Sequence, residues 1–160
     1  MEENKDQTHI AVVGCGYVGL TTAACLASLG HVVVGVESSL ERLESLQEGK
    51  TPFFEPGLEE LVESGLAANS LTFTSDLKSA VSQVQFVFIC VPTPSQDDGS
   101  ADLSIVRSVS KEMSDSLISG SIVILKSTVP IGTSIKVEEW IGRSDVEVAS
   151  NPEFLQAGRA

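Results

Sequence analysis

The sequence predicts an α/β fold, with a doubly wound sheet of about six mostly parallel strands and helices on both of its faces. Short apolar runs rich in Val and Ile alternate along the chain with segments of helical periodicity. These runs show little polar alternation, which is typical of parallel strands that helices cover on both sides. A glycine-rich turn, GCGYVG at 14–19, joins the first run to the first helical segment.

The expected elements alternate along almost the whole chain. Strands are expected at 9–14, 31–37, 71–74, 85–91, 121–127 and 146–150. Helices are expected near 17–29, 39–48, 57–68, 76–82, 103–118 and 133–141. The one large departure from alternation is the stretch 38–70, which holds two helices. Gly30 is expected to end the first helix, and Thr133 to be the N-cap of the last.

Length and composition indicate one globular domain. A chain of 160 residues with 42% hydrophobic and 20% charged residues can bury an aliphatic core. We expect residues 9–160 to form one Rossmann-type domain and residues 1–8 to form a disordered N-terminal tail.

Charge and cysteine content argue against several classes of partner. Ten basic and 22 acidic residues give a net charge of −12, whose field repels nucleic acid and anionic membranes. The chain shows no leader-like or membrane-spanning run, and a cytoplasmic location is expected. Because the three cysteines lack metal-ligand spacing, we expect no metal, and we interpret Cys15, Cys25 and Cys90 as reduced, buried small hydrophobic residues.

The glycine-rich turn predicts a seat for the pyrophosphate of a dinucleotide. Gly14, Gly16 and Gly19 have the spacing at which backbone N–H groups of a helix N-terminus meet phosphate, although a plain glycine turn would show it too. Glu37 ends the second strand 18 residues after Gly19, near the offset of an acid that binds ribose hydroxyls. Such a carboxylate repels a 2′-phosphate and favours NAD over NADP; a solvated strand-end glutamate is the alternative. Arg42 could flank the adenine ribose or receive a 2′-phosphate.

Polar loops follow the remaining strands, and in a parallel sheet the carboxyl ends of the strands meet at one edge. The fourth strand leads into a loop with Asp97, Asp98 and Asp102, which could suggest a metal but fit turn and N-cap chemistry better. The fifth strand leads into KSTVPIGT at 126–133, and the sixth into NPEFL at 151–155. This convergence predicts a site at that edge more strongly than any single motif does.

Five motifs, in this order, resemble those of one known family. They are GCGYVGL at 14–20, EPGLEEL at 55–61, VPTP at 91–94 followed by ADL at 101–103, KSTVPIGT at 126–133, and NPEFL at 151–155. From His9 to Ala160 the chain resembles the N-terminal, NAD-binding domain of the UDP-glucose/GDP-mannose dehydrogenase family.

The resemblance implies an NAD-dependent oxidation of a nucleotide sugar, with UDP-glucose as the expected substrate. The C6 hydroxymethyl group becomes a carboxylate while two NAD are reduced, and full-length members of the family are expected to be homo-oligomers. The family's cysteine nucleophile lies in a glycine-rich motif of a later domain, which these 160 residues do not contain. The nucleotide-sugar site belongs to the same later part, so we expect the isolated chain to bind NAD without turnover.

The resemblance also implies the site residues. Those for the pyrophosphate are Gly14, Gly16, Tyr17, Val18 and Gly19; those for the adenosine ribose are Glu37 and Arg42; and those toward the nicotinamide are Val91, Pro92, Thr93, Ser127 and Thr128. Two residues are implied in catalysis: Thr128 would orient the nicotinamide end and a water, and Glu153 would act as the acid or base.

The sequence departs from the family's pattern at three positions, and two other functions fit part of it. Glu37 stands where Asp is more common, Pro92 replaces a common Gly or Asn and loses a backbone donor, and Ala157 stands where many members have a second glutamate.

An NAD-sensing regulatory module would use the glycine turn but has no evident use for KSTVP and NPEFL together. The VPTP and EPGL motifs argue against the cofactor domain of a different NAD-dependent dehydrogenase.

Overall fold

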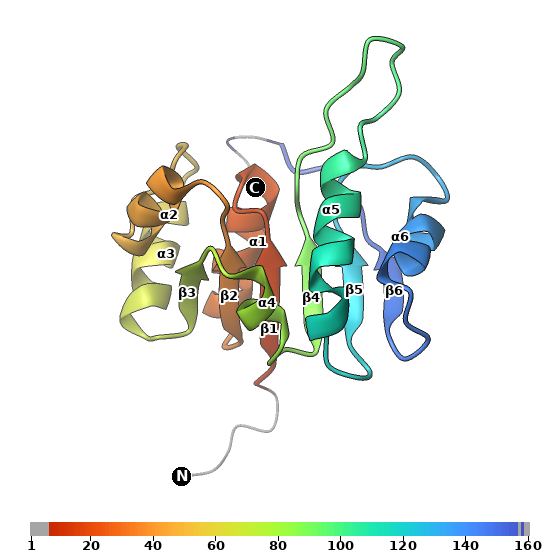
Figure 1. The fold of residues 1–160 in the computed structure, drawn as a ribbon. Coiled ribbons are helices and arrows are strands. Elements are labelled where there is room, and N and C mark those ends of the chain that lie inside the picture. Colours follow the sequence, from red (N-terminus) through yellow and green to blue (C-terminus); the bar gives the residue numbers. More distant parts are fainter. Residues whose placement is uncertain (1–6, 157, 159–160) are drawn as a thin grey trace.

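A six-stranded sheet, with every neighbouring pair parallel, forms the centre of the fold (Figure 1). The computed structural model describes residues 7–156 and 158, so residues 1–6 of the expected tail and Ala157 lie outside the described residues. The strands are β1 (His9–Val13), β2 (Val32–Val36), β3 (Leu71–Thr74), β4 (Phe86–Ile89), β5 (Ile122–Leu125) and β6 (Glu147–Ser150). Their order in the sheet, β3-β2-β1-β4-β5-β6, confirms the predicted doubly wound fold.

All six expected helices are present. They are α1 (Tyr17–Ser28), α2 (Leu40–Gln47), α3 (Leu58–Ala67), α4 (Leu77–Val81), α5 (Ser104–Met113) and α6 (Thr133–Ile141). Gly30 follows the end of α1 with a φ of 99°, as predicted for a helix-ending glycine. The prediction for Thr133 is wrong: Gly132 is the N-cap, and the Thr133 hydroxyl donates to the carbonyl of Pro130 at 2.7 Å.

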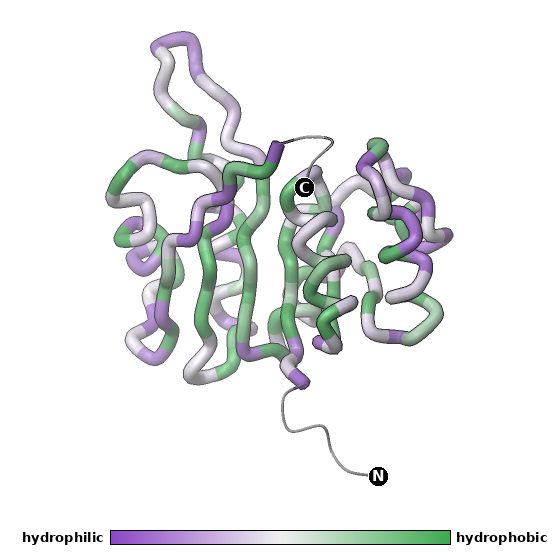
Figure 2. Tube along the Cα trace, turned by 180° about the vertical axis from the view of Figure 1, so that it is seen from behind, coloured by the Kyte–Doolittle hydropathy of each residue, from purple (hydrophilic) through white to green (hydrophobic). Residues whose placement is uncertain are grey.

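The helices bury both faces of the central strands. In β1, Ala11 and Val13 pack in a cluster with α4, α5 and α6, whereas Ile10 and Val12 pack in a cluster with α1, α2 and α3. Figure 1 shows α4 and α5 in front of the sheet, and Figure 2, seen from behind, shows α1 in front of the largely hydrophobic strands. This two-sided burial explains why the strand runs lack polar alternation.

The strand order reverses at β1 and β4, which lie side by side. The carboxyl ends of the strands share one edge of the sheet, the upper edge in Figure 1, where the loop 92–103 also projects. Open α/β sheets bind ligands outside the carboxyl ends of their strands at such a switch point. Among residues 7–156 and 158, no helix is both long and apolar enough to cross a membrane.

Candidate functional site

A cleft of about 980 Å³ opens where β1, β2, β4 and β5 end. This volume lies within the ~300–1,000 Å³ typical of small-molecule sites. Every predicted cofactor residue except Gly19 lines the cleft: Gly14, Gly16, Tyr17, Val18, Glu37, Arg42, Val91, Pro92, Thr93, Ser127 and Thr128. Of the two predicted catalytic residues, Thr128 lines the cleft and Glu153 does not.

The three glycines of the turn have different surroundings. Gly14 has a φ of 95°, and a Cβ on it would lie 2.9 Å from the carbonyl oxygen of Cys90. A Cβ on Gly19 would overlap the carbonyl oxygen of Gly14, so Gly19 lies behind the turn and lets α1 pack against the end of β1. A Cβ on Gly16 would meet no atom within 4 Å. Only Gly16 therefore leaves open space at the N-terminus of α1.

This arrangement fits the pyrophosphate of a dinucleotide. Gly16 is the N-cap of α1, whose first turn carries no acidic side chain. The first N–H groups of a helix lack partners within the helix, and the helix dipole adds positive charge at the same end. Because the chain has a net charge of −12, these local backbone donors matter for binding an anion.

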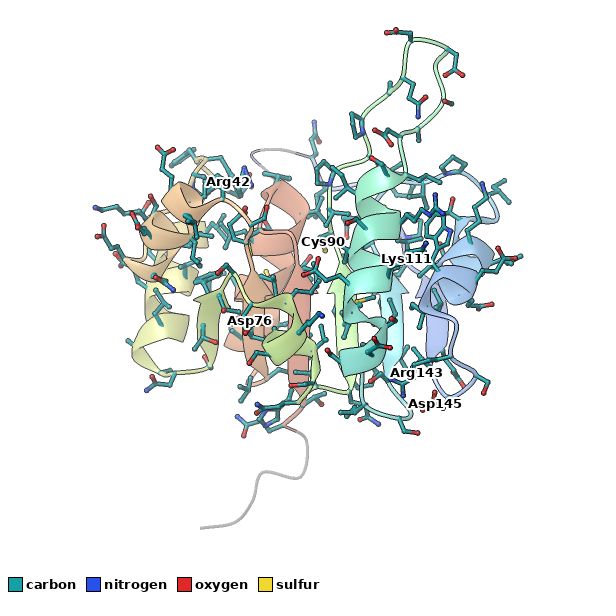
Figure 3. All side chains as sticks on the ribbon, viewed as in Figure 1. Arg42, Asp76, Cys90, Lys111, Arg143 and Asp145 are labelled. Atoms are coloured by element: carbon teal, nitrogen blue, oxygen red, sulfur yellow. The ribbon has the colours of Figure 1, made fainter. Side chains whose placement is uncertain are left out.

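Glu37 and Arg42 form an ion pair at the end of β2. The Glu37 side chain accepts hydrogen bonds from the Arg42 guanidinium at 3.0 Å and from the Ser39 N–H at 2.9 Å. Glu37 is 3% exposed, so it is not the solvated strand-end glutamate of the alternative interpretation. Figure 3 shows Arg42, a residue of α2, at the upper edge of the sheet. A carboxylate has about four acceptor positions, so Glu37 retains acceptor capacity for ribose hydroxyls.

Two hydroxyl groups join the loops after β4 and β5. The Ser127 hydroxyl donates to the carbonyl of Val91 at 2.6 Å, and the Thr93 hydroxyl donates to the carbonyl of Thr128 at 2.7 Å. Ser127 is buried, whereas Thr128 is exposed in the cleft. The two hydrogen bonds therefore place Thr93 and Thr128 together on one wall of the site.

Cys15 and Cys90 are not activated nucleophiles. Burial raises the pKa of Cys90, which lies at the upper end of β4 in Figure 3, to about 12. The pKa of Cys15 is also raised to about 12, first by burial and then by the charge of Glu37. Both thiols are therefore protonated near neutral pH and are poor nucleophiles. The prediction that Cys25 is buried is wrong, because its side of α1 is exposed to solvent.

Glu153 lies beside the end of β5, where Lys126 holds it. The Lys126 ammonium donates to the Glu153 carboxylate at 2.9 Å and to the side-chain oxygen of Asn151 at 3.0 Å. The Phe154 N–H donates to the other oxygen of Glu153 at 2.7 Å. The hydrogen bond from Lys126, which has the largest effect, and that from the Phe154 N–H lower the pKa of Glu153. Glu153 is thus ionised at neutral pH, and its carboxylate can accept a proton or orient a water.

One wall of the cleft was not predicted from the sequence. On α5, five residues face it at helical spacing: Ser104, Ile105, Ser108, Val109 and Glu112. Their i, i+4, i+8 pattern was the available signal, but it does not tell a ligand-facing stripe from a core-facing one.

The acidic loop after β4 has ordinary turn hydrogen bonds. Asp98 accepts from the N–H and the hydroxyl of Ser100, and Asp102 accepts from the N–H of Ser104 at 2.8 Å. The prediction that Asp102 is the N-cap of α5 is wrong by one residue, because Leu103 is the N-cap and Asp102 precedes it. In the part of the chain that the structure describes, no group of three or more His, Cys, Asp or Glu side chains is placed to hold a metal.

Comparison with known proteins identifies close relatives. The model of the UDP-glucose/GDP-mannose dehydrogenase family, NAD binding domain, matches residues 8–160. UDP-glucose 6-dehydrogenase of Rhizobium meliloti is 46% identical over 156 residues, which are 94% of this chain and 36% of that protein.

Two solved structures have the same fold. A UDP-glucose dehydrogenase from Pyrobaculum islandicum has a TM-score of 0.88 at 36% identity, over 100% of this chain and 39% of that one. GDP-mannose dehydrogenase from Pseudomonas aeruginosa, solved as a ternary complex, has a TM-score of 0.84 at 35% identity, over 93% of this chain and 37% of that one. The chain thus spans little more than a third of the proteins it matches.

The Lys126–Glu153 pair predicts a specific dependence on pH. Substitution Lys126→Met removes the main donor to Glu153, so the pKa of Glu153 should rise from its lowered value toward or above the ordinary 4.5. Because the folded-state pKa is lowered, the pair stabilises the chain above about pH 4.5, and this stabilisation is lost as the pH falls through the folded-state pKa. The difference in unfolding free energy between wild type and Lys126→Met should therefore shrink in acid.

Carboxyl NMR titration of Glu153 and urea unfolding at several pH values measure the two effects. Lys111→Met is a matched control, because Lys111 is an exposed lysine on α5. An unchanged pKa of Glu153 in Lys126→Met would show that the pair does not control its ionisation.

Proposed function

Because the chain belongs to the UDP-glucose/GDP-mannose dehydrogenase family, as its NAD-binding domain, we propose that it positions NAD to oxidise a nucleotide sugar. The reaction converts the C6 hydroxymethyl group to a carboxylate, with one water and two NAD consumed. NAD, when bound, supplies the hydride acceptor. The observation that carries the proposal is the open space at Gly16, in front of the N-terminus of α1.

The roles of the lining residues follow from their positions. The backbone of Gly14, Gly16, Tyr17 and Val18 holds the pyrophosphate, and the Glu37–Arg42 pair holds the adenosine ribose. The remaining residues hold the nicotinamide side of the cleft: Val91, Pro92, Thr93, Ser127 and Thr128. The part of Gly19 is indirect, since it only allows α1 to begin so close to β1.

Glu153 is the residue proposed to move a proton. Its carboxylate is ionised at neutral pH and lies at the same sheet edge as the cleft, where it accepts a proton from a reacting hydroxyl group or from water. The Thr128 hydroxyl orients the nicotinamide end and a water beside it. An NAD-sensing module, the alternative function, would have no use for an acid held ionised at this edge.

UDP-glucose is the proposed substrate, since the 46% identical relative is a UDP-glucose 6-dehydrogenase. The cysteine nucleophile and the sugar site are proposed to lie in the two-thirds of the related proteins that this chain does not span. A cytoplasmic homo-oligomer is proposed for a protein with all these parts. Joined to the remaining two-thirds of such a protein, the chain should support NAD reduction with UDP-glucose. Faster NAD reduction with GDP-mannose would contradict the choice of UDP-glucose as substrate.

Substitution Gly16→Ala should separate cofactor binding from folding. The added Cβ meets no protein atom within 4 Å and the φ of Gly16 is −73°, so the free energy of unfolding should not fall. The same methyl group occupies the space of the pyrophosphate, so the dissociation constant for NAD should rise by about tenfold or more. Calorimetry with NAD and urea unfolding measure the two quantities. Unchanged NAD affinity would contradict the placement of the pyrophosphate.

Glu37 should make the chain prefer NAD to NADP. NAD at 100 times its dissociation constant should add about 2.7 kcal/mol to the free energy of unfolding. NADP at the same concentration should add less, because its 2′-phosphate meets the carboxylate of Glu37. Thermal unfolding with each cofactor measures the two stabilisations. In Glu37→Gln the stabilisation by NADP should be closer to that by NAD. Equal or stronger stabilisation by NADP in the wild-type chain would contradict the proposal that Glu37 repels the 2′-phosphate.

A further inference from the structure

Three segments that are far apart in the sequence meet at the buried carboxylate of Glu55. Glu55 is 5% exposed and lies in the loop before α3. One of its oxygens accepts hydrogen bonds from the Tyr17 hydroxyl at 2.8 Å and from the Gly158 N–H at 2.7 Å. The ring of Tyr17 also packs against that of Phe53, with centroids 5.1 Å apart. We call Tyr17, Glu55 and Gly158 the latch.

Tyr17 belongs both to the latch and to the cofactor cleft. It is the first residue of α1, follows Gly16 directly and lines the cleft. Its hydroxyl lies at the far end of a rigid ring, where it contacts Glu55. A ligand that holds the N-terminus of α1 therefore also restricts the hydroxyl that Glu55 accepts from.

Residues 151–156 and 158, which include Glu153 and which we call segment 151–158, are held mainly by polar contacts. At its start Lys126 contacts Asn151 and Glu153, and at its end the Gly158 N–H donates to Glu55. Between these two points the Gln156 carbonyl accepts from the Tyr17 hydroxyl at 3.3 Å, Phe154 is 81% exposed and Leu155 is only partly buried, so apolar burial is a small part of the segment's placement. Gly158 has a φ of 82°, a conformation that glycine adopts readily and that directs its N–H toward Glu55.

We propose that Glu55 is a positioning residue that couples occupancy of the cofactor cleft to the placement of segment 151–158. The inference rests on the proposed function, since it takes NAD as the ligand of the cleft and Glu153 as the proton-transfer residue. Bound NAD restrains Tyr17, Tyr17 restrains Glu55, and Glu55 restrains Gly158. Coupling of this kind is reciprocal, so loss of the latch weakens NAD binding and NAD binding orders the segment.

Amide hydrogen exchange at Gly158, with and without NAD, tests the coupling. In Glu55→Gln the acceptor of the Gly158 N–H is a neutral amide instead of a carboxylate, so the hydrogen bond is weaker. Amide exchange at Gly158 should therefore become about tenfold faster. NAD should slow this exchange in wild type but not in Glu55→Gln, whose NAD affinity should fall by about threefold or more. Glu60→Gln is the matched control, because Glu60 is an exposed glutamate in the first turn of α3, and it should behave as wild type.

The tyrosine absorbance shows whether the latch forms in solution. Tyr17 is the only tyrosine of the chain, so its ionisation can be followed directly. Burial, and after it the hydrogen bond and charge of Glu55, raise the pKa of Tyr17 above its ordinary 10. Glu55→Gln should lower this pKa while Glu60→Gln leaves it unchanged. An equal pKa in all three proteins would overturn the latch.

Two further outcomes separate the inference from the proposed function. If NAD binds and slows exchange at Gly158 equally in wild type and Glu55→Gln, the coupling is wrong and the proposed function stands. If the wild-type chain does not bind NAD, the proposed function itself fails. If Glu55→Gln does not fold, Tyr17→Phe is the second variant, because it keeps the ring packing and removes only the hydroxyl. If NAD slows amide exchange at Gly158 in Tyr17→Phe as much as in wild type, the coupling is also wrong.

Discussion

The close approach of α1 to the end of β1 is the constraint on which the site depends. Gly19 packs against the carbonyl group of Gly14, at a position where any side chain would overlap that oxygen. Gly14 in turn lies against the backbone of Cys90 at the end of β4, with a positive φ that lets the chain turn within two residues. The N-terminus of α1 is therefore held at the switch point of the sheet, between the paired strands β1 and β4, from which the strand order runs in opposite directions.

From this position the helix end can bind an anion in spite of the charge of the chain. A net charge of −12 repels phosphate at long range, so affinity has to come from groups in contact with the ligand. The first N–H groups of α1, which have no partner within the helix, are such groups. Arg42 is another, although its guanidinium is held by Glu37. In the proposed function, the carboxylate of this pair accepts the ribose hydroxyls and repels a 2′-phosphate. The N-terminus of α1 would then supply affinity, and the end of β2 would supply selectivity.

The fold and most of the cleft could be predicted from the sequence, because their signals are local. Alternating apolar runs and right-handed crossovers limit the topology, and polar residues directly after parallel strands reach a common edge. Contacts between distant segments leave no such pattern: Glu55 and Gly158 are 103 residues apart, and Lys126 and Glu153 are 27 apart. The prediction that Cys25 is buried was wrong because α1 has small or apolar residues on most of its sides. Its sequence periodicity therefore does not indicate which side faces solvent.

Chemical-shift mapping of the isotope-labelled chain during a titration with NAD tests most directly that the N-terminus of α1 and the end of β2 form the cofactor seat. The largest saturable changes should occur at the amides of Gly14, Gly16 and Tyr17 and at those of Glu37 and Ser39, which surround the cleft and its ion pair. Saturable changes confined to the acidic loop 95–101, with the amides of the glycine turn unmoved, would contradict the account.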